Sequence, residues 1–203
     1  MHSKPGAVAG AALLLMLLAA CQPVPTGSPS VTVSPVATGP APVCTATPGA
    51  TPTPCTAEQQ AAQQAEQQKQ DALYREAERV YRAFVAEDVR LMRSGAKADD
   101  AVLTFLAEPE KGSYFSSVAR SNELGIKVVG GDLRVALLRP APDKTNAEYT
   151  IVLESCLDSS SMTGYQGSKS LGPGPILHGF TYFKTEQSGL KIAKRDDRKV
   201  ASC

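Results

Sequence analysis

The chain of 203 residues carries 21 Lys and Arg against 20 Asp and Glu, so its formal net charge is only +1. This balance argues against a nucleic-acid-binding protein, which presents an excess of positive charge to the phosphate backbone. The length is sufficient for one domain with its own hydrophobic core.

The first residues have the pattern of a secretory signal. Lys4 supplies a positive charge, and residues 7–20 are apolar without interruption apart from Gly10. This run is shorter than the roughly 18 residues that a membrane-spanning helix needs. We therefore expect a signal peptide at residues 1–20 and export of the rest of the chain, without a retained transmembrane helix.

The end of this signal, Leu18-Ala19-Ala20-Cys21, resembles the lipobox of bacterial lipoproteins. In those proteins the cysteine is diacylated through its sulfur and becomes the first residue after cleavage. The resemblance implies a lipid anchor on Cys21 at the extracytoplasmic face of the cell membrane. Two or three acyl chains, at about 0.8 kcal/mol per buried methylene, make a lasting anchor. The alternative is an ordinary secretory signal that ends near a cysteine.

The segment after the lipobox has its own composition. Residues 22–56 contain nine of the fifteen prolines and no charged residue. Such a segment cannot bury enough apolar surface to fold, and its prolines favour extended conformations. We expect residues 21–56, beginning with the lipidated Cys21, to form a disordered tether rich in Pro, Thr and Ser. Residues 57–203 are then the folded domain.

The cysteine count supports both export and lipidation. The five cysteines are Cys21, Cys44, Cys55, Cys156 and Cys203. If Cys21 carries lipid, the other four can form two disulfides outside the cytoplasm. We favour Cys44 with Cys55 in the tether and Cys156 with Cys203 in the domain, although the sequence permits three pairings. Neither pair has CxxC spacing and the mature chain keeps one histidine, so we expect no metal and no cofactor.

A long helix is expected at the start of the domain. Thr56 and Gln59 form a capping-box pattern, and strong helix formers continue to Gly95, a typical stop. The first half is polar on all sides, which predicts a solvated extension. The second half has apolar residues at three- and four-residue steps, namely Leu73, Ala77, Val80, Tyr81, Phe84, Leu91 and Met92. We expect this stripe to face the protein's own sheet; a coiled coil or a docking face is the alternative.

The rest of the chain predicts two short helices followed by antiparallel strands. The helices are expected at residues 99–107 and 113–124, and strands within 126–140, broken at Gly130-Gly131, and within 148–158. A Ser- and Gly-rich loop is expected at 159–175 and a hairpin at 176–195, with Ser188-Gly189 at its tip. Helices first and strands afterwards predict an α+β domain, in which one long and two short helices pack on a curved antiparallel sheet.

This order of elements resembles the nuclear transport factor 2-like cone fold. The stretches "VLESCLDSS" and "VASC" are similar to those of small lipoproteins from high-GC Gram-positive bacteria that carry this domain. These proteins commonly have a Cys-x-Asp in a middle strand and a cysteine near the carboxyl terminus, matched here by Cys156, Asp158 and Cys203. The chain departs from the pattern at Leu190, where a tryptophan often begins the last strand. The resemblance implies a cone-like fold and an extracytoplasmic place, but no uniform activity.

Three side chains are candidates for a shared cavity. Enzymes with the cone fold use a carboxylate base and a hydrogen-bond donor between the sheet and the first helices. Asp88 is expected on the apolar side of the long helix, where burial raises the pKa of a carboxyl group. His178 and Tyr182 are expected on one face of the hairpin strand. The alternative is that His178 is a satisfied structural residue and Asp88 lies at the edge of the stripe.

The remaining features favour binding over catalysis. The chain contains no serine-hydrolase, zinc-protease or phosphate-loop motif. The charge run at residues 194–199 mixes two aspartates with four cations, which favours a solvated strand end or turn. We expect a membrane-anchored, non-catalytic binding or envelope-assembly module, whose partners are the membrane and an envelope protein and whose ligand the sequence does not specify. The alternative is a small-molecule enzyme or carrier that uses the cone cavity.

Overall fold

The structure is a computed structural model that describes residues 43–44 and 53–203. The expected signal peptide, Cys21 and most of the expected tether lie outside these residues. The described part combines α-helices with antiparallel β-sheets, which confirms the α+β class. Its helices are α1 (Ala57–Ser94), α2 (Asp100–Leu103), α3 (Glu110–Glu123) and the short 3-10 helix η1 (Pro142–Lys144). None of these helices is long and apolar enough to cross a membrane.

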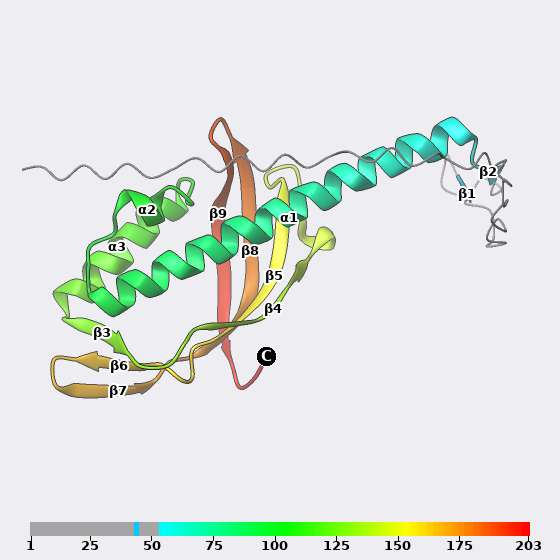
Figure 1. Cartoon of the computed structure of the whole chain (residues 1–203). Helices are drawn as coiled ribbons and strands as arrows, with labels where there is room; N and C mark the ends of the chain where they lie inside the picture. The colour runs from blue at the N-terminus through cyan, green and yellow to red at the C-terminus, as the bar shows by residue number, and fades with distance from the viewer. Residues whose placement is uncertain (1–42, 45–52) are drawn as a thin grey trace, which may run out of the picture. The chain divides into compact units, whose positions relative to one another are not determined.

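The helix α1 begins at the capping box that the sequence predicts. The backbone N–H of Gln59 donates to Thr56 Oγ1 at 3.2 Å, and the N–H of Thr56 donates to Gln59 Oε1 at 2.9 Å. The helix ends at Gly95, whose φ of 64° lies in the left-handed region that favours glycine. Residues 57–72 are exposed apart from the half-buried Gln60, and this part of α1 extends beyond the sheet (Figure 1).

The apolar stripe of α1 packs on the protein's own sheet, as expected. The helix contributes Ala77, Val80, Tyr81, Phe84, Val85 and Leu91 to the hydrophobic core. The strands contribute Ile151, Leu153, Phe183, Leu190 and Ile192. Because the strand residues cover the stripe, it is not available as a coiled-coil face.

The larger sheet has four antiparallel strands in the order β4-β5-β8-β9, and α1 lies across one face of it (Figure 1). The strands are β4 (Arg134–Pro140), β5 (Ile151–Asp158), β8 (Ile176–Glu186) and β9 (Gly189–Val200). The expected hairpin joins β8 to β9. Its two-residue loop is Gln187 and Ser188, one residue earlier than predicted, because Gly189 already pairs with Glu186.

A register shift interrupts the pairing of β8 with β9. Tyr182 lies opposite Lys194, but Phe183 lies opposite Ile192, so Ala193 is an extra residue in β9. Such a bulge changes which face the following side chains occupy. As a result, Ile192 and Arg195 both lie on the side of α1, where Ile192 joins the core and the Arg195 guanidinium lies over the ring of Phe84.

A smaller sheet replaces the long loop that the sequence predicts at residues 159–175. Its strands are β3 (Ile126–Val129), β6 (Thr163–Gln166) and β7 (Lys169–Pro173), in the order β3-β6-β7. The prediction of a loop is wrong because β6 and β7 form a hairpin that turns at Gly167, where φ is 60°. The Gly- and Ser-rich sequence lacks the run of β-branched residues that indicates a strand. These residues form strands because β6 pairs with β3.

The two short helices differ in extent from the prediction. α2 ends at Leu103, because Phe105 and Ala107 exchange backbone hydrogen bonds with Ile192 of β9, each 2.8 Å long. These residues therefore extend the edge of the larger sheet rather than continue the helix. α3 begins at Glu110, directly after Pro109 and earlier than expected.

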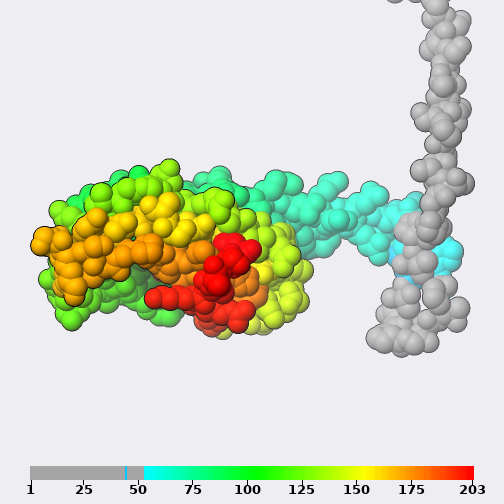
Figure 2. All heavy atoms as spheres, turned by 90° about the horizontal axis from the view of Figure 1, so that it is seen from below, coloured from blue at the N-terminus to red at the C-terminus, as the bar shows by residue number. Residues whose placement is uncertain are grey.

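Two disulfides are present, with the favoured pairing. Cys44 is bonded to Cys55 and Cys156 to Cys203. The first lies beside the start of α1, next to the short strands β1 (Val43–Cys44) and β2 (Thr53–Pro54). The second ties the C-terminal residues to β5; Figure 2 shows these residues (red) at the molecular surface. Paired cysteines agree with an extracytoplasmic protein.

Candidate functional site

A pocket of about 270 Å³ lies between α1, α3 and β3. Its walls are largely apolar and are formed by Leu91, Met92, Ala96, Val118, Ile126 and Val128. Ser117, Ser121 and Asn122 of α3 add polar groups, and Asp88, Tyr114 and Arg195 complete the lining. An apolar hollow with a few convergent polar groups is the usual form of a small-molecule site.

Asp88 and Tyr114 are joined by a short hydrogen bond. The Tyr114 hydroxyl donates to Asp88 Oδ1 at 2.7 Å and links α3 to α1. Burial raises the pKa of the Asp88 carboxyl, and the Tyr114 hydroxyl and the Arg195 charge offset only part of this rise. Burial, followed by the charge of Asp88, raises the pKa of Tyr114. Tyr114 is therefore a neutral donor at physiological pH.

Arg195 connects the pocket to the core of the sheet. Its Nε donates to Glu110 Oε1 at 2.8 Å, and the side chains are only 25% and 14% exposed. The guanidinium lies 4.9 Å from the ring centroid of Phe84 and 5.8 Å from that of Tyr114. The charge run at 194–199 forms the end of β9, and five of its six residues are exposed, as predicted. Arg195 is the exception, because it is half-buried and faces inward.

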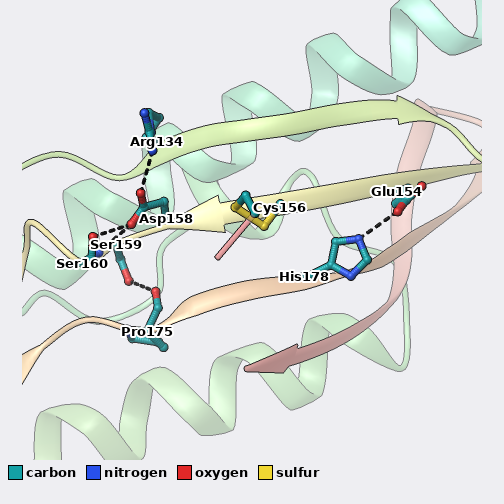
Figure 3. Close-up of a disulfide and its surroundings, with 9 residues drawn as sticks. Arg134, Glu154, Cys156, Asp158, Ser159, Ser160, Pro175 and His178 are labelled. Carbon is teal, nitrogen blue, oxygen red and sulfur yellow. Dashed lines mark hydrogen bonds and ion pairs between the residues drawn. A yellow bond between two sulfur atoms is a disulfide. The ribbon is translucent and has the colours of Figure 1, made fainter. Parts of the chain in front are cut away.

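His178 and Tyr182 lie on the other face of the sheet. His178 Nε2 is 2.8 Å from Glu154 Oε1 (Figure 3). Arg139 Nε donates to Oε2 of the same carboxylate at 2.7 Å. The hydrogen bonds of Arg139, and then of His178, lower the pKa of Glu154. The Tyr182 ring contacts the Tyr149 ring at a tilt, with the ring centroids 4.8 Å apart and an interplanar angle of 51°. The polar groups of His178 and Glu154 are therefore paired with each other and with Arg139, as is typical of residues with a structural role.

The expected cavity with Asp88, His178 and Tyr182 is not formed. Side chains alternate along a strand, so Phe183 of β8 faces the core while Tyr182 and His178 face away from α1. Asp88 lines the pocket on the α1 side, which neither His178 nor Tyr182 lines. Among residues 43–44 and 53–203, no group of three His, Cys, Asp or Glu side chains is placed to hold a metal ion.

Sequence reasoning found Asp88 but missed its neighbours. Tyr114 and Glu110 belong to a helix whose hydrophobic pattern is weak, because most of α3 is exposed. Glu110 and Tyr114 are four residues apart, and this spacing puts two residues on the same face of a helix. It is the feature of the sequence from which their common position could have been predicted. For Arg195, a strict alternation along β9 predicts the opposite face.

The raised pKa of Asp88 predicts a pH-dependent effect of Asp88→Asn. An aspartate in the unfolded chain has a pKa of about 3.9, so the folded state binds the proton more tightly. The stability that this proton contributes is fully present below the unfolded pKa and is lost as pH rises through the folded pKa. Asp88→Asn should therefore gain stability relative to the unmodified protein between pH 4 and pH 7, measured by urea unfolding.

The matched control has the opposite sign. Arg90 lowers the pKa of the exposed Asp99, so the stability that Asp99→Asn lacks develops as pH rises to the unfolded pKa of about 3.9. Above about pH 5 the difference between Asp99→Asn and the unmodified protein should stay nearly constant. If the difference in free energy of unfolding between Asp88→Asn and the unmodified protein stays constant from pH 4 to pH 7, Asp88 is not a buried carboxyl with a raised pKa.

No protein-family model matches the chain, and no curated protein is similar to it in sequence. Among solved structures, the chain is similar to the intermembrane space region of the chloroplast protein ARC6. The likeness has a TM-score of 0.41 and 12% sequence identity, and it covers 62% of this chain and 96% of that chain. At this level the likeness carries no argument about function.

Proposed function

We propose that this protein is an exported lipoprotein, anchored through Cys21 to the extracytoplasmic face of the cell membrane, with a non-catalytic binding domain. The observation that carries the proposal is the pairing of the other four cysteines, Cys44 with Cys55 and Cys156 with Cys203. This pairing assigns every cysteine but Cys21, which stands in the lipobox-like motif. Disulfides persist in oxidising compartments, to which a lipoprotein signal directs its chain.

We also propose a cone-like arrangement related to the nuclear transport factor 2-like domains. The packing of α1 and α3 on one side of the strands supports it (Figure 1). So does the position of Cys156 and Asp158 in one strand, with Cys156 bonded to Cys203. Leu190, which stands where a tryptophan is common in the resembling lipoproteins, is buried in the core.

Binding in the pocket is favoured over catalysis by how its polar groups are engaged. Asp88 accepts a hydrogen bond from Tyr114, and Arg195 is held by Glu110. The histidine and phenol expected to complete a catalytic set, His178 and Tyr182, lie on the opposite face. The expected envelope protein partner stays a prediction from the sequence; Phe115, Leu124, Val129 and Leu171 are exposed apolar side chains that such a partner could contact.

The lipid anchor is tested by Cys21→Ser. The full chain is produced in a bacterial host that processes lipoproteins, with an alkyne-labelled fatty acid in the medium. We expect the unmodified protein to take up the label and sediment with membranes. Cys21→Ser should take up no label and should be released from the membrane or remain unprocessed, because a single hydroxyl cannot replace the acyl chains.

Ser28→Ala is the matched control in the same segment, and it should be labelled and anchored like the unmodified chain. Absence of label from the unmodified protein contradicts the proposal, and so does membrane retention of a Cys21→Ser chain from which the signal peptide has been cleaved.

A further inference from the structure

The inner end of the pocket carries more negative than positive charge. Arg195 is the cation there, and it is paired with Glu110 at 2.8 Å. Asp88 adds a second carboxylate, so the three groups sum to one net negative charge when Asp88 is ionised. Asp197, which is exposed and follows two residues later on β9, adds a further negative charge nearby. A cationic group that enters the pocket therefore compensates charge that the protein leaves unbalanced.

Asp88 has one oxygen available to a ligand. Its Oδ1 accepts the hydrogen bond from Tyr114. Within residues 53–203 no side chain or backbone group donates to Oδ2, and Asp88 is half-buried in the pocket lining. Burial raises the pKa of this carboxyl, because ionising a buried group costs free energy. A neighbouring cation offsets that cost by favouring the ionised form. The group best suited to Oδ2 is an ammonium, which donates charge-assisted hydrogen bonds.

The walls and the volume define the rest of the ligand. Leu91, Met92, Val118, Ile126 and Val128 present aliphatic surface. The volume of about 270 Å³ corresponds to about nine water molecules in the liquid. It lies just below the usual range for drug-sized ligands. The matching ligand therefore has a short hydrocarbon body of the size of an octyl chain.

We propose that this pocket binds a small amphipathic amine, whose ammonium group pairs with Asp88 and whose hydrocarbon body packs on the aliphatic side chains of α1, α3 and β3. The inference rests on the proposed binding function and names its ligand class. An anionic ligand is disfavoured because Arg195 is already engaged by Glu110 and stacked on Phe84. A ligand carboxylate would also face Asp88, a like charge.

Three probes of equal length test the ligand class: n-octylamine, n-octanol and n-octanoate. An alkylamine is cationic at pH 7, as a lysine side chain is. The protein is the full mature chain with Cys21→Ser, so that no detergent competes, and binding is measured by calorimetry. We expect n-octylamine to bind about tenfold or more tightly than n-octanol, since a hydrogen bond to a charged group is worth at least a tenfold change in affinity. We expect n-octanoate to bind least.

Two variants and one control locate the site. Asp88→Asn keeps an acceptor for Tyr114 but removes the charge, so it should abolish the preference for the amine over the alcohol. Ser117→Trp places a large ring at the exposed lining of the pocket and should abolish binding of all three probes. Ser116→Trp, on the same helix but outside the pocket lining, should bind like the parent chain.

The outcomes separate this inference from the proposed function. Equal or tighter binding of n-octanol or n-octanoate, or an amine preference that survives Asp88→Asn, overturns the amine inference and leaves the binding pocket in place. Failure of all three probes to bind overturns the amine inference and the binding role of this pocket, and leaves the lipid anchor, which Cys21→Ser tests, in place. Should Asp88→Asn fail to fold by circular dichroism, the ranking of the three probes and the effect of Ser117→Trp still decide.

Discussion

Replacing Cys203 with serine is expected to lower the free energy of unfolding by about 4 kcal/mol. The disulfide from Cys156 to Cys203 spans a sequence separation of 47 residues. In the chain-entropy model, a link of this length restricts the unfolded chain strongly. Cys156 is fully buried while Cys203 is exposed, so substitution of Cys203 leaves a small apolar thiol in the sheet and creates no cavity. Urea unfolding under non-reducing conditions measures the loss.

Two controls isolate the covalent link. In excess reductant, Cys203→Ser and the unmodified protein should unfold at similar urea concentrations. Cys44→Ser breaks the other disulfide, beside the exposed residues 57–72 of α1. It should affect unfolding of the core less than Cys203→Ser does. A loss below about 1 kcal/mol for Cys203→Ser contradicts the expected role of the link.

Phe84→Ala is expected to destabilise the domain by about 3–5 kcal/mol, the usual range for truncation of a buried aromatic side chain. Phe84 is 1% exposed, meets the Tyr114 ring edge-on at 5.6 Å, and lies under the Arg195 guanidinium. Its loss opens a cavity at the point where the core meets the pocket. Phe84→Leu retains much of the apolar volume and should cost less, because smaller cavities cost less.

Phe115→Ala provides the matched control. Phe115 stands on α3 next to Tyr114 but is 51% exposed, so its truncation should change the free energy of unfolding by no more than about 0.5 kcal/mol. Thermal and urea unfolding of the three variants give the comparison. Equal effects for Phe84→Ala and Phe115→Ala would mean that the Phe84 contact is not part of the stabilising core.

The features that the sequence predicts well are local ones. Thr56 and Gln59 specify the start of α1 through one pair of hydrogen bonds, and Gly95 specifies its end. The helical repeat also placed Asp88 on the apolar side, because a period of 3.6 residues is set by the backbone alone. The β6–β7 hairpin was missed, because its order comes from pairing with β3, a partner distant in the sequence.

The candidate site was only partly predictable for the same reason. The single extra residue Ala193 reverses the faces of β9, so that Arg195 rather than Lys194 faces α1. No local pattern indicates this bulge, because it depends on the register between β8 and β9. The mistaken grouping of Asp88 with His178 and Tyr182 has the same cause. Strand alternation correctly predicts that His178 and Tyr182 share one face of the sheet. It does not predict which face α1 covers, and α1 covers the other one.

The exposed start of α1 has a geometric consequence for any chain attached to it. Residues 57–72 rise by 1.5 Å each, which gives a rigid arm of about 24 Å that ends at the Cys44–Cys55 link. Each residue inserted into this arm would turn the attachment point by about 100° around the helix axis. An insertion in this arm would therefore change the direction in which the attached chain leaves the domain, as well as its distance from the sheet. The same insertion in a proline-rich coil would change only a length.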